Sequence, residues 1–89
     1  MEIKKRKLTP IEIENMGIES WPIWEKEKSV FDWYYDTAEQ CYIIQGKVIV
    51  HYGDGESIEI EKGDFVEFPA GLKCRWEIVE DLKKHYNFP

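Results

Sequence analysis

Two short segments of the chain, Glu39–Gly46 and Gly63–Gly71, constrain its fold more than any other feature. The first has the pattern E-x6-G and the second the pattern G-D-x4-P-A-G, with sixteen residues between them. Glycine adopts backbone conformations that a Cβ atom forbids, and proline interrupts a strand because it has no amide donor. Apolar runs of strand length and composition flank both segments. The two segments therefore predict two strand–turn units of one small β-domain.

The length and composition fit a single globular domain, residues 1–89. A chain this short buries a small core, so oligomerisation would add to its stability. Apolar residues make up 43% of the chain and argue against disorder. No run approaches the roughly 18 apolar residues that span a bilayer, and Met1–Lys7 leads into no signal-peptide stretch. We therefore expect a cytoplasmic protein with no membrane partner.

The charge pattern disfavours nucleic acid as a partner, because the net charge is −6. The one basic run, Lys4–Lys7, is better explained as the solvated face of an edge strand. Two cysteines in a cytoplasmic setting predict free thiols. Thirteen Glu and ten Lys against four Asn and Gln together resemble the composition of heat-adapted proteins, which suggests a thermophilic source.

Nearly the whole chain is predicted to be β-structure, with only a turn or one helical turn over Ile11–Met16. Gly46 is expected to separate two strands of a hairpin, Ala38–Gln45 and Lys47–Tyr52. Gly53-Asp54-Gly55 is a strong turn signal that predicts antiparallel pairing of the second of these strands with Ser57–Glu61. The other expected strands are Ile3–Leu8, Trp21–Glu25, Ser29–Tyr35, Phe65–Phe68, Cys74–Val79 and Asp81–Phe88. Eight or nine short strands with frequent turns predict a closed sandwich or barrel.

Strand alternation indicates which side chains point inward. Arg75 and Glu77 have the character of solvated residues, so the opposite face of that strand is the inner one. The predicted inward residues are Phe31, Trp33, Tyr35, Glu39, Cys41, Ile43, Cys74, Trp76, Ile78, Leu82, Lys84, Tyr86 and Phe88. His51 and His85 have the opposite parity and are expected at the surface. An inward carboxylate and an inward lysine among apolar neighbours are unusual, because burying an unpaired charge is costly.

At these residues the sequence resembles the cupin superfamily, whose general pattern is G-x5-H-x-H-x3,4-E-x6-G followed by G-x5-P-x-G-x2-H-x3-N. The segments Glu39-x6-Gly46 and Gly63-x5-Pro69-x-Gly71 match this pattern. Trp33 and Tyr35 stand at the positions of the first two histidines, and Cys74 stands at the position of the third. The resemblance implies an all-β fold, a cupin-type jelly-roll barrel (double-stranded β-helix) of minimal size, with a pocket at its mouth.

The runs E-x-C-Y-I-I-Q-G-K-V, G-D-F-V-E-F-P-A-G-L-K-C-R-W and K-H-Y-N-F resemble a subgroup of small single-domain cupins. That subgroup is related to the cupin domain of ureidoglycine aminohydrolases. The resemblance covers about residues 31–88 and implies a homodimer joined through β-strands. It also suggests an aminohydrolase acting on a ureido compound, although the missing histidines weaken that assignment.

Four residues are candidates for catalysis: Glu39, Cys74, Tyr35 and Lys84. Glu39 would act as general acid or base on a small polar metabolite, with Tyr35 and Lys84 orienting it. As a nucleophile, Cys74 would need Lys84 or a metal, because a nearby carboxylate disfavours the thiolate. Four further residues are candidates for ligand contact: Trp33, Trp76, Cys41 and Tyr86. Each also has a structural explanation, since free cysteines and aromatic side chains commonly fill cores.

Three functions are compatible with this pattern. The first is an enzyme acting on a small polar metabolite, and the second is a non-catalytic module that binds a small ligand. The third is a metal-dependent enzyme with Glu39 and Cys74 as atypical ligands. It is disfavoured, because two protein ligands are too few to hold a divalent ion tightly. The sequence therefore identifies no definite cofactor, and a divalent metal is disfavoured. The expected partner is a small molecule.

Overall fold

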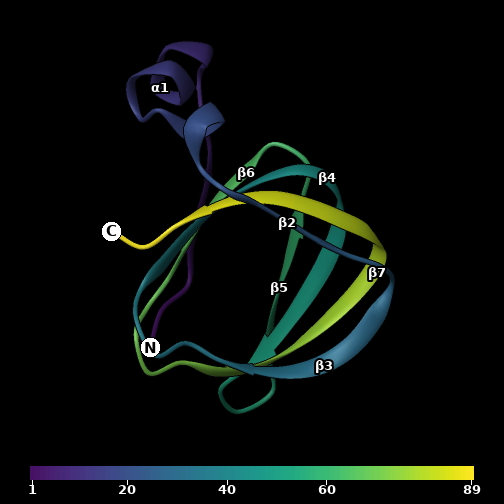
Figure 1. The fold of residues 1–89 in the computed structure, drawn as a ribbon. Helices are drawn as coiled ribbons and strands as arrows, with labels where there is room; N and C mark the ends of the chain where they lie inside the picture. Colours follow the sequence, from purple (N-terminus) through teal and green to yellow (C-terminus); the bar gives the residue numbers. More distant parts are fainter.

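The computed structural model describes residues 1–89 and is built around two long strands, β4 (Glu39–Tyr52) and β7 (Lys73–Asn87). These strands pair antiparallel along nearly their whole length and form the centre of one seven-stranded sheet. The sheet curls round on itself, so that its inner face encloses the core (Figure 1). The all-β cupin-type fold that the sequence predicts is thereby confirmed.

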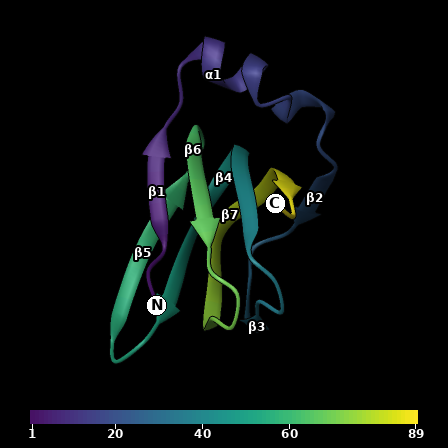
Figure 2. The ribbon, with the colours of Figure 1, turned by 90° about the vertical axis from the view of Figure 1, so that its left-hand side faces the viewer.

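Shorter elements extend the sheet on both sides of this pair. On the β4 side, β5 (Glu56–Glu61) and β6 (Asp64–Phe68) pair with different halves of β4, and β1 (Lys4–Lys7) pairs with β6. On the β7 side, β2 (Ile23–Lys26) and β3 (Ser29–Tyr34) pair with its two halves. The helix α1 (Pro10–Asn15) and the 3-10 turn η1 (Ile18–Ser20) connect β1 to β2 at one end of the molecule (Figure 2).

The hairpin predicted at Gly46 is wrong, because residues 39–52 form one continuous strand. Gly46 has a φ of +93°, and a Cβ atom there would collide with the backbone carbonyl of Asp81 in β7. The pairing register between β4 and β7 shifts around the same point. The glycine therefore permits a close approach of two bent strands, and the chain bends here without reversing. The predicted break between Cys74–Val79 and Asp81–Phe88 is wrong for the same reason, since β7 also continues through the bend.

The remaining local predictions agree with the structure. β5 pairs with the second half of β4 through the Gly53-Asp54-Gly55 turn. The possible helical turn near Ile11 is the helix α1, which Thr9 and Glu12 begin with a reciprocal capping box. No helix of the structure is long and apolar enough to cross a membrane.

The core occupies the inner face that strand alternation predicts. Cys41, Ile43, Trp76 and Ile78 are all buried, as expected from their shared parity. His51 lies outside, where its ring nitrogen contacts Glu77. His85 also lies on the outer face, but it is half-buried and its Nδ1 is 2.9 Å from the carbonyl oxygen of Trp21.

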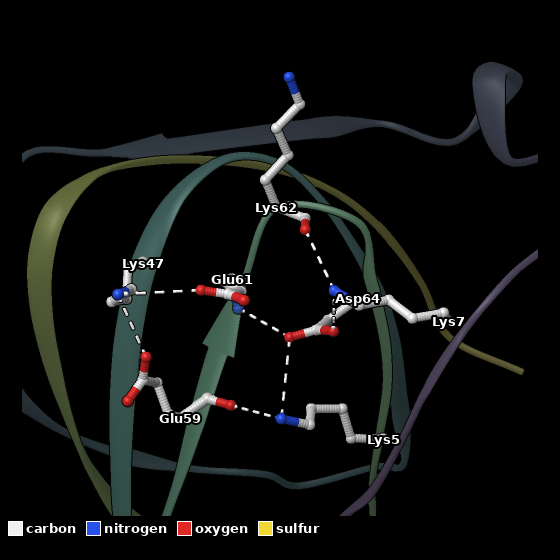
Figure 3. A network of polar contacts seen from close by, with 7 residues as sticks. All are labelled: Lys5, Lys7, Lys47, Glu59, Glu61, Lys62 and Asp64. Atoms are coloured by element: carbon white, nitrogen blue, oxygen red, sulfur yellow. Dashed lines mark hydrogen bonds and ion pairs between the residues drawn. The ribbon is translucent and has the colours of Figure 1, made fainter.

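The basic run of β1 has a structural partner in Asp64, the residue after the first glycine of the second motif (Figure 3). The Asp64 carboxylate is only 2% exposed and lies 2.7 Å from Lys7 Nζ. It also accepts a hydrogen bond from the backbone N–H of Glu61. The hydrogen bond to Asp64 raises the pKa of Lys7. All four residues of β1 are exposed, so this edge strand is held mainly by its ladder with β6 and by Asp64.

Candidate functional site

A cavity of about 210 Å³ opens on the inner face of the sheet, between β2, β3 and the adjoining halves of β4 and β7. Seven of its nine lining residues are aromatic, and the other two carry the only charges. The lining residues are Trp24, Phe31, Trp33, Tyr35, Glu39, Trp76, Lys84, Tyr86 and Phe88. A concave aromatic surface with a few convergent polar groups is typical of a small-molecule site.

The charged residues of the cavity form a buried ion pair. Glu39 is the first residue of β4, and Lys84 lies near the end of β7, where Ile43 of β4 pairs with it. Lys84 Nζ is 2.9 Å from Glu39 Oε2, and the two side chains are only 7% and 8% exposed. Cys41 completes the group, since its thiol donates to the same oxygen at 2.9 Å and its sulfur lies 3.2 Å from Lys84 Nζ.

The surroundings keep Lys84 charged and Cys41 neutral at neutral pH. Burial opposes the Lys84 ammonium, but interaction with Cys41 and Glu39 outweighs it and the pKa of Lys84 is raised. The ammonium also lies 5.0 Å from the ring centre of Trp24 and 4.8 Å from that of Trp76. Burial raises the pKa of the Cys41 thiol to about 12. The Cys41 proton is therefore available as a hydrogen-bond donor to Glu39.

One oxygen of the Glu39 carboxylate remains free. Both hydrogen bonds to this side chain go to Oε2. Oε1 accepts none, and it is not among the fully buried polar atoms that lack a partner. It is therefore the atom through which the carboxylate can accept a hydrogen bond from a molecule in the cavity.

Tyr35 and Trp76 line the cavity with their rings, while their polar atoms are fully buried. The Tyr35 ring stacks on Phe68 with centres 4.6 Å apart. Tyr35 Oη and Trp76 Nε1 have no hydrogen-bond partner. The indole N–H nevertheless lies close enough to the hydroxyl to oppose the rise that burial causes in the pKa of Tyr35. Burial prevails, so Tyr35 stays protonated at neutral pH.

Cys74 does not line the cavity, although it was predicted as a site residue. Its side chain nevertheless neighbours two residues that do, Trp76 and Tyr35. Its Sγ is 3.6 Å from the carbonyl oxygen of Trp33, and it borders a separate, shallow groove on the outer side of β3 and β7. Cys74 pairs with Trp33 near the start of β7, whereas Lys84 lies near the other end of that strand. Burial raises the pKa of Cys74 to about 11, which disfavours a nucleophilic thiolate.

The residues present do not fit a divalent metal ion. Nowhere do three or more His, Cys, Asp or Glu side chains converge as a ligand set. Of the two ligands considered from the sequence, Glu39 lines the cavity and Cys74 does not. The Lys84 ammonium already binds the Glu39 carboxylate at 2.9 Å, and a second cation beside it would be repelled.

Sequence reasoning missed three cavity residues as ligand contacts: Trp24, Phe31 and Phe88. Strand alternation could have identified two of them, since Phe31 shares parity with Trp33 and Phe88 shares parity with Lys84. The sequence contains no such indication for Trp24. It reaches the site because β2 pairs with the end of β7 and places Trp24 opposite Lys84, a long-range pairing that alternation within one strand cannot predict.

A curled antiparallel sheet that encloses a cavity on its inner face is the architecture of a small cupin domain. The chain belongs to the EutQ-like cupin domain family, whose family model matches residues 13–86. No curated protein matches the sequence.

Solved structures agree with this assignment. The chain is 56% identical to a DUF861 family protein from Thermotoga maritima, with a TM-score of 0.96 over 99% of this chain and 100% of that one. The Clostridium difficile EutQ protein is 22% identical, with a TM-score of 0.69 over 98% of this chain and 68% of that one. A putative ethanolamine utilization protein Q from Salmonella typhimurium is 17% identical, with a TM-score of 0.67 over 97% and 68%. The last two show a shared fold alone.

Proposed function

We propose that this cupin binds a small polar metabolite in the aromatic cavity and that the Glu39–Lys84 pair is its polar recognition element. The observation that carries the proposal is the free Glu39 Oε1 beside a charged Lys84, within walls made of seven aromatic side chains. The cavity holds the volume of about seven water molecules, which suits only a small ligand. Ring faces would bind its planar part, and the ion pair would orient its polar group.

The protonation states of Lys84 and Cys41 support binding. The pKa of Lys84 and that of Cys41 are both raised, so both groups stay protonated near neutral pH. A site with constant charge presents the same hydrogen-bond donors and acceptors to a ligand across the physiological range.

Acid–base catalysis on the bound metabolite is the second candidate. The observation that favours it is the set of contacts among Glu39, Cys41 and Lys84, which brings two proton donors to one carboxylate oxygen. In this scheme Glu39 acts as general base or acid, with Lys84 and Tyr35 orienting the substrate. An aminohydrolase reaction on a ureido compound, which the sequence resemblance suggests, is one reaction of this kind.

We also propose a homodimer in the cytoplasm, from a thermophilic source. The outer residues of the edge strand β3 support strand-mediated dimerisation, because Val30 is 62% exposed and Tyr34 is 50% exposed. Light scattering on the purified protein gives the mass directly, and a mass of 10.7 kDa would refute the dimer. A melting temperature in the ordinary mesophile range would count against the thermophilic source.

A screen of small polar metabolites, including ureido compounds, tests the function. Binding is followed by the shifts of the tryptophan indole N–H signals in NMR spectra, and product formation by chromatography of the same samples. Glu39→Gln is expected to weaken binding, whereas Glu27→Gln, at an exposed carboxylate with no partner, is expected to leave it unchanged. Product that Glu39→Gln abolishes would establish catalysis. Indole signals that no compound perturbs would refute a binding role for the cavity.

A further inference from the structure

We infer that the cavity selects a ligand that is uncharged overall and carries a hydrogen-bond donor. The inference rests on the proposed function and specifies its ligand class. It follows from the charges of the lining residues, since Glu39 and Lys84 are the only charged ones and they neutralise each other.

A ligand with net charge would have no counter-charge in this cavity. It would lose hydration on entering a space walled by aromatic rings, and a charge buried without a partner is strongly disfavoured. The two side chains that could balance it are already paired at 2.9 Å, and both are less than a tenth exposed. An uncharged ligand avoids this cost.

Aromatic walls alone would favour a cationic ligand, because the face of an indole attracts positive charge. Here the two indole rings nearest the ion pair already hold a cation. The Lys84 ammonium lies 5.0 and 4.8 Å from the ring centres of Trp24 and Trp76, so these faces hold a cation that belongs to the protein. A second cation would meet the charge of Lys84 at the same place.

The polar atoms of the site then define the hydrogen-bonding group that the ligand carries. Glu39 Oε1 accepts no hydrogen bond within the protein, so a ligand N–H or O–H can donate to it. A carboxamide has such a donor, is planar and carries no charge, and therefore represents the class.

Three isosteric probes test the inference: benzamide, benzamidinium and benzoate, which are similar in shape and differ in charge. Dissociation constants come from titrations that follow the indole N–H signals of Trp24 and Trp76. In the wild-type protein, benzamide is expected to bind at least about tenfold more tightly than either charged probe. Equal or tighter binding of a charged probe would overturn the inference while leaving the proposed function intact. The absence of any shift with all three probes would also overturn the inference, whereas the proposed function is decided by the metabolite screen described above.

Charge-changing variants of the pair extend the test. Glu39→Gln leaves the ammonium unpaired and is expected to favour benzoate, whereas Lys84→Met leaves the carboxylate unpaired and is expected to favour benzamidinium. The double variant Glu39→Gln/Lys84→Met restores neutrality and is expected to favour benzamide again. If a single variant fails to fold, the wild-type protein and the double variant decide. An unchanged preference in both folded single variants would overturn the assignment of selectivity to this pair.

Discussion

Removing one member of the Glu39–Lys84 pair is expected to destabilise the protein far more than removing a matched surface charge. Lys84→Met is the informative change, because methionine keeps an unbranched apolar chain beside Trp24 and Trp76 while deleting the ammonium. It leaves a carboxylate that is 8% exposed without its counter-charge.

The geometry gives the magnitude. At 2.9 Å and an effective dielectric constant of about 20, the attraction between the two charges is about 6 kcal/mol before desolvation is subtracted. Removing one partner of such a buried pair costs about 3–5 kcal/mol, because the remaining charge stays buried. The double variant Glu39→Gln/Lys84→Met leaves no charge behind and is expected to be more stable than either single variant by about 2 kcal/mol.

Urea denaturation followed by tryptophan fluorescence measures these differences. Arg75→Met is the matched control on the same strand, since Arg75 pairs with Asp32 at 3.2 Å but both side chains are well exposed. That change is expected to cost less than about 1 kcal/mol. If Lys84→Met costs no more than Arg75→Met, the pair is solvated in solution and the reasoning about the cavity's charge fails.

Three further predictions concern other parts of the fold. Gly46→Ala places a Cβ atom against a backbone carbonyl and is expected to cost at least about 3 kcal/mol in urea denaturation, whereas Gly55→Ala, in open space, is expected to cost about 1–2 kcal/mol. Asp64→Ala removes the partner of Lys7 and is expected to cost about 1–3 kcal/mol and to speed amide exchange in β1; unchanged exchange would contradict the anchoring role. Burial raises the pKa of Cys41 from 9.0 to about 12, so the folded state keeps a proton that the unfolded chain releases. Stability is therefore expected to fall between pH 9 and 12, and denaturation across that range should show a smaller fall for Cys41→Ala.

Local patterns in the sequence predicted much of the fold because they depend on neighbouring residues. Strand alternation placed Cys41, Trp76 and Lys84 on the inner face, where the structure has them. The error at Gly46 has a physical origin. A glycine with positive φ is required both by a tight reversal and by a bend against another strand, and only the position of Asp81 decides between them.

The candidate site was less predictable than the fold, because its contacts join residues far apart in the chain. Glu39 and Lys84 were both expected inside, but their distance depends on the register of β4 against β7. Cys74 stands at a position where the family pattern has a ligand, yet the register places it opposite Trp33 and at the other end of β7 from Lys84, and it does not line the cavity. Motif spacing and alternation therefore identified the inner faces of β4 and β7. The register between the two strands determined that Glu39 and Lys84 lie in contact.

The bend shared by β4 and β7 has a consequence for how the molecule unfolds. Both strands run through both halves of the curled sheet, so neither half can come apart without breaking the ladder of the other. We expect unfolding as a single cooperative unit, with the slowest amide exchange near Val48 and Ile78, which pair beside the bend.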